Sequence, residues 1–394
     1  MPDFRIYWTK PTGSLRSGND IMKKMLVFAV ASVLLLSGCS NKEKDFDNGW
    51  RIISYYDSAE YDKNGMFLPK TDENEYLEFL DFTTMETAPV CDDPSCTHKD
   101  PEACTAYGKN NHPFIYDGKL YYFTETDIYQ KNNEYSRNTK LWQSDINGAN
   151  EKEIYEFEDC TIQYYDRLLL CEGTIYICAV DQPYDQNYDE LEPSVVLFSF
   201  DLKKHKMSEP VKIVEGYGCS SWLYGAWDGE VIIRTSKSVD NRPYMEKLEE
   251  YAKDNALTDK QAMAEFEDMY TSKIISYEPD KEKISVCELP EPLAVTEKFY
   301  FYNDGDSLKY IDDNGENVIE QIKNADAVTD HGDYCIISSE NSTYIFSYET
   351  QEINEITLDE GLSVAAIYQE NVILYRADSV SYEKKSISEL EQPK

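Results

Sequence analysis

Three cysteines and one histidine lie close together in the pattern Cys91-x4-Cys96-x-His98-x5-Cys104. Thiolate and imidazole groups are the ligands of tetrahedral zinc, and they also suit copper or iron. Acidic residues lie on both sides of the histidine and add negative potential that favours a cation. The sequence therefore predicts a metal site in this segment.

Three interpretations of this Cys/His motif stay open. The first is a structural metal clip, with zinc as the expected ion, that pins a long loop against the first repeat of the fold. The second is one disulfide plus a leftover thiol, which suits a compartment outside the cytoplasm. The third is a functional metal, redox or metal-sensing site. The spacing is not that of a standard zinc finger, so it does not choose between them.

No catalytic constellation stands out in the rest of the sequence. The chain has no Gly-x-Ser-x-Gly elbow, no phosphate-binding Gly-rich loop and no His-Glu-x-x-His pair. Carboxylates are so numerous that no pair can be singled out for acid–base chemistry. His112, His205 and His331 lie singly in turn-like or polar segments, and we expect them to be surface residues. We assign no catalytic residue and no cofactor other than the metal.

The amino-terminal segment has the features of an export signal. Met22-Lys23-Lys24 precedes an apolar run over 25–36, which is too short to span a bilayer and suits a signal peptide. The run ends in Leu36-Ser37-Gly38-Cys39, which resembles a bacterial lipobox. That resemblance implies a diacylglycerol on Cys39 and cleavage just before it.

These features divide the chain into three parts. We expect residues 1–38 to be removed, with Met22 as the true start of the signal peptide. Residues 39–48 are polar and charged, as a lipidated tether should be. Residues 49–390 form the folded body. The protein is then expected on the extracytoplasmic face of the cell membrane, held there by lipid on Cys39.

The net charge limits the partners. The chain has 75 acidic and 38 basic residues, a net charge of −37, and removal of residues 1–38 makes it more negative still. Such a body repels phosphate backbones, so we expect no nucleic-acid binding. Cations, basic proteins and neutral polymers remain as partners, and solubility outside the cell is the simplest reason for the charge.

The cysteine count does not suggest a fully paired disulfide framework. The chain has 10 cysteines, so an odd number remains once Cys39 is lipidated. Cys178, Cys287 and Cys335 lie singly in apolar runs, where free cysteine behaves as a small hydrophobic residue. We expect these three in the core.

The body repeats two short β units. The first is a strand, a tight turn and a second strand, as at 114–123 around Asp117-Gly118. Asp-Gly and related pairs supply the positive φ angles that a two-residue hairpin requires. Clear copies lie at 169–178, 226–234 and 329–337, and weaker copies at 65–68, 298–302 and 371–375.

The second unit is an alternating strand that ends in an acidic turn. It is clearest at 141–148 and 308–315, with weaker copies at 77–82, 197–202, 274–279, 344–350 and 379–384. Two such halves in tandem make a four-stranded sheet, and radial repetition of that sheet is a propeller. The sequence predicts an all-β fold, a seven-bladed β-propeller, with six or eight blades as near alternatives and two stacked β-sandwiches as another fold. We expect the opening strand at 50–56 to pair with the last blade and close the ring.

One segment, 244–269, departs from the β pattern. Residues 244–255 and 258–269 have apolar residues at helical spacing, and Thr258 with Gln261 forms a capping-box signature. We expect a helical hairpin inserted between two strands of the third or fourth blade. Its apolar stripe is expected to pack on the propeller face, and a docking role is the alternative.

The chain resembles the TolB-like β-propeller lipoproteins of Gram-positive gut bacteria. The resemblance rests on the lipobox, on the units at 116–122 and 141–148, and on Cys-Asp-Asp-Pro-Ser-Cys-Thr-His at 91–98, which is similar to a Cys-x-Asp-Pro-x-Cys-x-His signature. It implies a propeller fold and an extracytoplasmic location, and it implies no activity.

Two function classes follow for such a propeller. The first is a non-catalytic module that binds an unknown glycan, peptide or envelope protein, most simply at the mouth of the central channel. The second is a hydrolase acting on envelope or other polymers, with carboxylates at that channel. We expect the first, because no acid–base set is identifiable. Carboxylates converging with a His or Arg at the channel mouth would favour the enzyme.

Overall fold

The computed structural model of the chain describes residues 49–54, 64–68, 76–100, 104–109, 111–129, 135–157, 167–181, 192–340 and 342–391. The chain divides into two units, 1–45 and 46–394, and all described residues belong to the second. The predicted lipidation site Cys39 and the predicted tether at 39–48 lie outside the described residues. Within the described part, no helix is long and apolar enough to cross a membrane.

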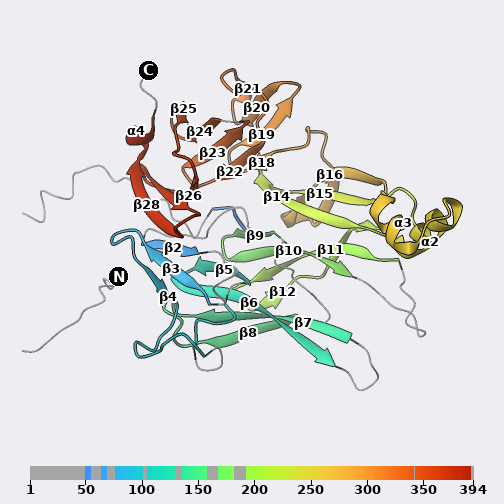
Figure 1. Cartoon of the computed structure of the whole chain (residues 1–394), viewed down its shortest axis with the longest axis horizontal. Coiled ribbons are helices and arrows are strands. Elements are labelled where there is room, and N and C mark those ends of the chain that lie inside the picture. Colours follow the sequence, from blue (N-terminus) through green and yellow to red (C-terminus); the bar gives the residue numbers. More distant parts are fainter. Residues whose placement is uncertain are drawn as a thin grey trace, which may run out of the picture. The chain divides into compact units, whose positions relative to one another are not determined.

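The described strands form seven antiparallel sheets, which are the blades of a β-propeller (Figure 1). The first four blades, in hydrogen-bonded order, contain β2 (Gly65–Leu68), β3 (Glu78–Asp81) and β4 (Thr87–Pro89); β5 (Asn111–Tyr116), β6 (Lys119–Tyr129), β7 (Tyr135–Ser144) and β8 (Lys152–Phe157); β9 (Leu168–Cys171), β10 (Thr174–Asp181) and β11 (Ser194–Asp201), with β12 (Lys206–Met207) and β13 (Val211–Glu215) both on β11; and β14 (Ser220–Trp227), β15 (Glu230–Ser238), β16 (Tyr270–Glu278) and β17 (Lys283–Val286).

The last three blades continue the same pattern. They contain β18 (Ala294–Val295), β19 (Tyr300–Asp304), β20 (Ser307–Asp312) and β21 (Gly315–Ile319); β22 (Ala327–Asp330), β23 (Tyr334–Ser339), β24 (Ser342–Ser347) and β25 (Ile353–Ile356); and β26 (Leu362–Tyr368), β27 (Asn371–Arg376) and β28 (Ser381–Ser386). A 3-10 turn, η1 (Pro279–Lys281), and a short helix, α4 (Ile387–Leu390), complete the set together with the insertion described below. The prediction of seven blades is confirmed.

The predicted tight turns form where the acidic-Gly pairs occur. Asp117-Gly118, Glu172-Gly173 and Asp228-Gly229 each have positive φ at both residues and join strands as two-residue loops. The copy around His331-Gly332 is different, because only Gly332 has positive φ and four residues separate the paired Asp330 and Cys335. Three of the four clear copies are therefore two-residue hairpins, and the fourth is a longer loop.

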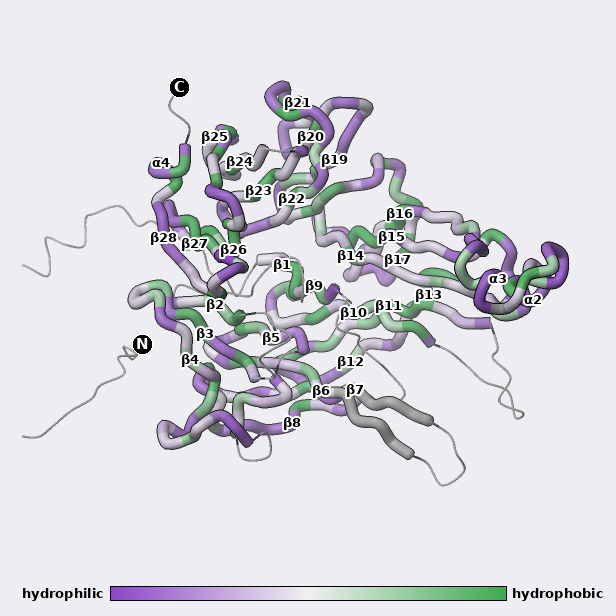
Figure 2. Tube along the Cα trace, in the orientation of Figure 1, coloured by the Kyte–Doolittle hydropathy of each residue, from purple (hydrophilic) through white to green (hydrophobic). Residues whose placement is uncertain are grey.

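Hydrophobic clusters hold the blades to one another. Each of the seven junctions between neighbouring blades contains one cluster of buried apolar side chains. These clusters form because strand residues alternate between the two faces of each sheet, and consecutive residues of inner strands such as β9 and β10 are buried, so both faces are covered. Figure 2 shows hydrophobic residues along the strands. At the closing junction, Leu80 and Phe82 of the first blade pack against Ala366 and Ile373 of the last. Lys384 Nζ also donates to Phe82 O across this junction at 2.8 Å.

The opening strand does not close the ring as predicted. β1 (Arg51–Ile53) pairs with β9 and becomes an extra strand at the inner edge of the third blade. The physical reason is that neighbouring side chains of β1 point to opposite faces of the sheet, and both faces are buried. Ile53 joins the cluster between the second and third blades, and Ile52 joins the cluster between the third and fourth. Trp50 stacks on Tyr176 of the third blade at 5.6 Å between ring centroids.

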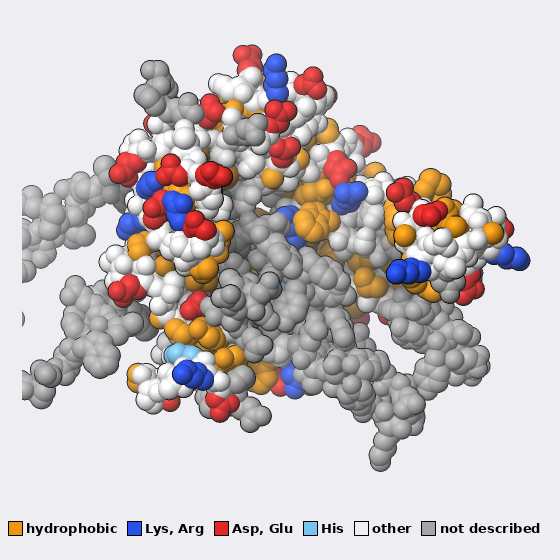
Figure 3. Space-filling view, viewed as in Figure 1, with side chains coloured by type: hydrophobic (Ala, Val, Ile, Leu, Met, Phe, Trp, Pro, Cys, Tyr) orange, Lys and Arg blue, Asp and Glu red, His pale blue; other side chains and the backbone are white. Residues whose placement is uncertain are grey.

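Figure 3 shows the charged side chains on one face of the described residues. On the face drawn in Figure 3, Asp and Glu side chains are scattered with Lys and Arg among them, and no broad basic patch is visible. This distribution agrees with the net charge of −37.

The helical insertion lies between β15 and β16 of the fourth blade. It consists of α2 (Tyr244–Asp254) and α3 (Asp259–Glu265), and Thr258 N donates to Gln261 Oε1 at 3.1 Å as the capping box predicts. The prediction that the apolar stripe packs on the propeller face is wrong. Leu248, Ala252 and Ala262 form a cluster within the insertion itself, because the two helices bury their apolar residues against each other.

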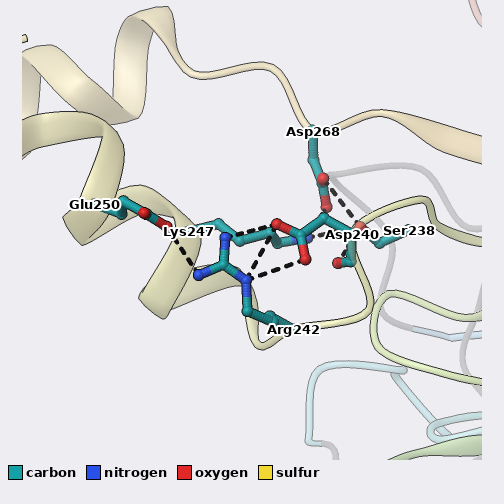
Figure 4. A network of polar contacts seen from close by, with 6 residues as sticks. All are labelled: Ser238, Asp240, Arg242, Lys247, Glu250 and Asp268. Carbon is teal, nitrogen blue, oxygen red and sulfur yellow. Dashed lines mark hydrogen bonds and ion pairs between the residues drawn. The ribbon is translucent and has the colours of Figure 1, made fainter. Parts of the chain in front are cut away.

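Polar contacts fix the insertion to the ends of its flanking strands (Figure 4). Lys247 Nζ lies 2.5 Å from Asp268 Oδ2 and 2.7 Å from Ser238 Oγ, and both charged side chains are nearly buried. Arg242 pairs with Asp240 and Glu250 in a more exposed group.

Candidate functional site

The predicted metal motif lies in the connection between the first two blades. β4 ends at Pro89 and β5 begins at Asn111, so the motif occupies the passage from the outer strand of one blade to the inner strand of the next. The end of this passage is tied to the first blade by Leu77 N, which donates to Ala106 O at 3.0 Å.

The second blade supports the beginning of the same connection. Gly148, in the turn after β7, has φ +86°, and a Cβ built there would lie 2.7 Å from Val90 O and 3.7 Å from Thr105 Oγ1. Only glycine allows this close approach with that backbone. The loop is therefore held by both blades, whereas the sequence predicted contact with the first.

The structure brings the four predicted ligands together. One ligand atom from each of Cys91, Cys96, His98 and Cys104 lies within 4.8 Å of all the others. His98 Nδ1 is 3.3 Å from Cys104 Sγ. Sulfur ligands on a tetrahedral zinc with Zn–S bonds of about 2.3 Å lie ~3.8 Å apart, so the separations suit such an ion. This cluster could hold a metal.

Local turns arrange the four residues. Asp93 Oδ1 accepts from Ser95 N at 2.8 Å, and Asp93 O accepts from Cys96 N at 3.0 Å, which makes a tight turn between the first two cysteines. His98 has φ +53°, a left-handed conformation that is uncommon outside glycine. Tyr107 Oη donates to His98 O at 3.1 Å and holds this turn.

Groups around the cluster donate toward the sulfur atoms. His98 N donates to Cys96 Sγ at 3.4 Å, and Thr105 Oγ1 lies 3.5 Å from Cys91 Sγ. Outer contacts of this kind orient metal ligands and stabilise thiolate charge. Cys91 Sγ and Cys96 Sγ therefore have hydrogen-bond partners whether or not an ion is bound.

Cys91 and Cys104, the first and last cysteines of the motif, differ in pKa. Burial raises the pKa of Cys91, but hydrogen bonds with Thr105 and with the backbone of Asp93 outweigh it and leave that pKa below its ordinary value. Burial raises the pKa of Cys104 to about 11. Cys104 is the buried member of the cluster, and the other three residues are half-buried.

The remaining cysteines and histidines were predicted only in part. No disulfide joins the eight cysteines that the structure describes. Cys178 and Cys335 are buried as predicted, whereas Cys287 is only half-buried.

The prediction of surface histidines is wrong for two of the three. His205 is exposed, but His112 and His331 are buried, with 0% and 5% exposure. His112 Nδ1 lies 2.5 Å from Asn111 Oδ1, and its ring contacts Phe123 edge to face. His331 lies in the longer loop between β22 and β23, and burial lowers its pKa to about 4.

A second candidate site is a cavity of about 230 Å³ in the central channel. Residues from β1, β9, β14, β18 and β22 line it, and these are the inner strands of the third to sixth blades. Its charged lining residues are Arg51, Arg167, Glu297, Asp326 and Asp330. The arginines and carboxylates that would favour an enzyme are thus both present.

Other contacts hold several of these charged residues in place. Arg167 stacks over the Trp222 ring at 4.2 Å, and its Nη1 donates to Leu223 O at 3.4 Å. Asp330 Oδ1 accepts from Tyr348 Oη at 2.9 Å and from Gly332 N at 3.1 Å. A binding site in the channel was expected from the sequence, but its residues could not be identified there because they come from segments far apart in the chain.

No family model matches the sequence, and a comparison with curated proteins finds no relative. Solved structures that resemble the chain include the β-propeller domain of the trilobed protease from Pyrococcus furiosus, with 10% identity and a TM-score of 0.41, covering 88% of this chain and 100% of that one. Porphyromonas gingivalis dipeptidyl peptidase 4 has 10% identity and a TM-score of 0.37, with 85% of this chain and 53% of that one covered.

A third similar structure is an ulvan lyase of polysaccharide lyase family PL25, with 10% identity and a TM-score of 0.38, covering 86% of this chain and 94% of that one. At such low identity these similarities concern the propeller fold alone. They carry no activity over to this chain.

Proposed function

We propose that this protein is a lipid-anchored, extracytoplasmic propeller that acts as a non-catalytic binding module and takes its ligand in the central channel. The observation that carries the binding role is the channel cavity, where inner strands of four blades converge around charged side chains. Concave sites with a few convergent polar groups are the usual place for a ligand. The partner is a glycan, a peptide or an envelope protein, and the acidic surface argues against nucleic acid.

The cellular location is proposed from the amino-terminal sequence. Lipid on Cys39, as in the TolB-like lipoproteins that the chain resembles, would hold the body at the outer face of the cell membrane. An alkyne-labelled fatty acid fed to producing cells should label the chain, and the Cys39→Ala variant should lose both the label and membrane association. Equal labelling of the two proteins would contradict the anchor.

The Cys/His cluster is proposed as a structural zinc clip that fixes the connection between the first two blades. Residues 40–394, purified without added metal, should contain one zinc per chain and show the full mass of free thiols. The Cys104→Ser variant should lose the zinc. A mass lower by two hydrogens with no metal would instead assign a disulfide plus a leftover thiol.

A blocked channel tests the binding role. Ala327 is exposed and lines the cavity, so Ala327→Trp should fill it, while Ala264→Trp places the same side chain on the exposed face of α3. Ligands found on peptide and glycan arrays should be lost by the first variant and kept by the second. The binding role at the channel is refuted if every ligand tolerates Ala327→Trp.

A hydrolase acting on an envelope polymer is the second candidate. The observation that favours it is the presence of Glu297, Asp326 and Asp330 in the same cavity as two arginines. Release of reducing ends or free amino groups from purified envelope material would support it, provided that Asp326→Asn or Asp330→Asn abolishes the release. Release that persists in both variants and in Glu297→Gln would count against this candidate.

A further inference from the structure

The helical insertion exposes a concentration of apolar side chains. Eleven large apolar side chains are exposed among the described residues, and six of them lie in the insertion and the strand ends that carry it. These six, which we call the insertion surface, are 44–70% exposed: Val239, Tyr244, Met245, Met263, Met269 and Tyr270. Single exposed apolar residues are ordinary on a soluble protein, whereas a concentration of them marks an interaction site.

The core of the insertion does not account for this exposure. Leu248, Ala252 and Ala262 form that core, and none of the six residues of the insertion surface belongs to a hydrophobic cluster of the described residues. Three of the six are methionines, whose flexible and polarisable side chains recur at surfaces that bind partners. The two helices thus bury one set of apolar residues against each other and leave a second set exposed.

Contacts bring the parts of the insertion surface together. Val239 N donates to Met269 O at 2.8 Å, which extends the pairing of β15 with β16 beyond its last strand pair. Burial raises the pKa of Tyr270, and Tyr244 on α2 lies close enough to add to this rise. The ring centroid of Tyr244 also lies 5.6 Å from that of Phe266 at the end of α3. The two strand ends, α2 and the end of α3 therefore lie close to one another.

The charge of the insertion indicates what kind of partner would cover this surface. Residues 239–270 contain nine acidic and four basic residues. Two of the basic residues, Arg242 and Lys247, already pair with carboxylates of the same segment. In the described part of the chain, five exposed carboxylates of the insertion have no ion pair and no side-chain hydrogen bond: Glu246, Glu249, Asp254, Glu265 and Glu267. Figure 3 shows acidic and hydrophobic side chains together on the insertion, at the right of the view where Figure 1 labels α2 and α3.

These two features distinguish between possible occupants. A second copy of this chain would bring the same acidic insertion and a net charge of −37, so the two copies would repel each other. An anionic lipid surface would repel the same carboxylates. An amphipathic helix with apolar residues on one face and Lys or Arg beside them would bury the apolar side chains and meet the carboxylates with opposite charge.

We propose that the insertion surface binds a cationic amphipathic helix of a partner protein. None of the six residues lines the channel cavity. The inference therefore concerns a second binding surface and does not rest on the proposed role of the channel.

Methyl NMR tests where a model helix binds. The full chain, with isotope-labelled methionine methyl groups and purified in nonionic detergent, is titrated with a short Leu/Lys peptide that has a leucine face and lysine flanks when helical. The methyl signals of Met245, Met263 and Met269 should shift and saturate, whereas that of the buried Met66 should not move. The same peptide with Glu in place of every Lys should bind at least about tenfold more weakly. No saturable shift at the three insertion methionines, or equal affinity for the two peptides, would overturn the inference.

A pair of methionine substitutions tests the apolar part of the surface. The double variant Met263→Gln, Met269→Gln should weaken binding of the Leu/Lys peptide about tenfold, because it replaces the apolar contacts and keeps the charge. The double variant Val318→Gln, Val380→Gln changes similarly exposed residues of other blades and should bind the peptide normally. Equal affinities of the two double variants would overturn the inference.

A pair of glutamate substitutions tests the charge. The double variant Glu246→Gln, Glu249→Gln should weaken binding about fivefold and make it less sensitive to salt. The double variant Glu320→Gln, Asp378→Asn removes two exposed carboxylates elsewhere and should change neither the affinity nor its dependence on salt. The same salt dependence in both double variants would contradict the role of the insertion carboxylates and overturn the inference.

Three results would assign the peptide or the surface differently, and each would overturn the inference. Loss of peptide binding in Ala327→Trp would place the peptide in the channel, and it would leave the proposed function in place. Dimers of the full chain that are lost in Met263→Gln, Met269→Gln would assign the surface to a second copy. Phosphatidylglycerol vesicles that shift the three insertion methyl signals when the Leu/Lys peptide does not would assign it to a lipid surface.

Discussion

The ion pair between Lys247 and Asp268 is the contact whose loss should most directly release the helical insertion from the fourth blade. Lys247 Nζ lies 2.5 Å from Asp268 Oδ2 and 2.7 Å from Ser238 Oγ (Figure 4). The Lys247 and Asp268 side chains are only 5% and 9% exposed. Replacing Lys247 with methionine keeps most of the aliphatic volume but leaves the Asp268 carboxylate buried without its cation.

The expected loss is large but local. Breaking one partner of a buried ion pair costs about 3–5 kcal/mol, whereas an exposed pair contributes about 1 kcal/mol or less. The apolar residues of the insertion, Leu248, Ala252 and Ala262 among them, pack within the insertion and join none of the clusters between blades. The destabilisation should therefore appear as opening of α2 and α3 while the seven blades stay folded.

Hydrogen exchange measured by mass spectrometry distinguishes local opening of the insertion from unfolding of the blades. In Lys247→Met, amides of α2 and α3 should exchange about 200- to 5,000-fold faster, the equivalent of about 3–5 kcal/mol. The exposed-pair control Arg242→Gln should accelerate the same amides by only about fivefold. The double variant Lys247→Met, Asp268→Leu should recover most of the protection, because no unpaired charge remains buried.

Two results would show that the Lys247–Asp268 pair does not hold the insertion in this way. The first is an acceleration in Lys247→Met no greater than in Arg242→Gln. The second is a double variant that exchanges as fast as Lys247→Met alone, since the loss could not then come from the unpaired carboxylate.

Two further predictions concern His331 and Gly148. Burial lowers the pKa of His331 from 6.5 to about 4, so the unfolded chain binds the extra proton between these values. Neutral His331 therefore does not reduce the free energy of unfolding above pH 6.5, and that free energy falls by about 3 kcal/mol as the pH drops to 4. Urea unfolding at several pH values should show that His331→Gln loses this part of the pH dependence of the free energy of unfolding. The same pH dependence in the variant and the original protein would contradict the prediction. Gly148→Ala should displace the start of the connection that carries the Cys/His cluster and speed zinc loss to a chelator, because the new Cβ would lie 2.7 Å from Val90 O. The control Gly118→Ala has a similar φ and open space around the new Cβ, so it should keep its zinc. Equal zinc loss in the two variants would show that the contact with Val90 is unimportant.

Features encoded in neighbouring residues were predictable from the sequence. The acidic-Gly turns and the alternating strands depend on pairs and short runs, and they led to the right number of blades. The Cys/His cluster was also visible, because all four candidate ligands come from one short loop. Such features are set by backbone preference and side-chain alternation, which act over a few residues.

Features that depend on contacts between distant segments were not predictable. The β1 strand pairs with β9, more than a hundred residues away along the chain, because Ile52 and Ile53 fill clusters on two sides of the third blade. The channel cavity likewise combines Arg51 with Asp330. No local pattern marks either arrangement.

The burial of isolated polar residues could not be predicted from the sequence either. His112 and His331 lie in turn-like segments that gave no sign of burial, yet both are enclosed. The apolar stripe of the insertion was identified, but its partner was not, because periodicity shows that a face is buried and does not show what covers it.

We propose that the connection between the first two blades is a zinc centre made by Cys91, Cys96, His98 and Cys104, whose ligand atoms lie within 4.8 Å of one another. X-ray absorption at the zinc edge, on protein purified without added metal, tests it most directly. We expect three sulfur ligands at about 2.3 Å and one nitrogen ligand at about 2.0–2.1 Å, with the nitrogen replaced or the metal lost in His98→Ala. A zinc shell of oxygen and nitrogen alone, or protein without zinc, would contradict it.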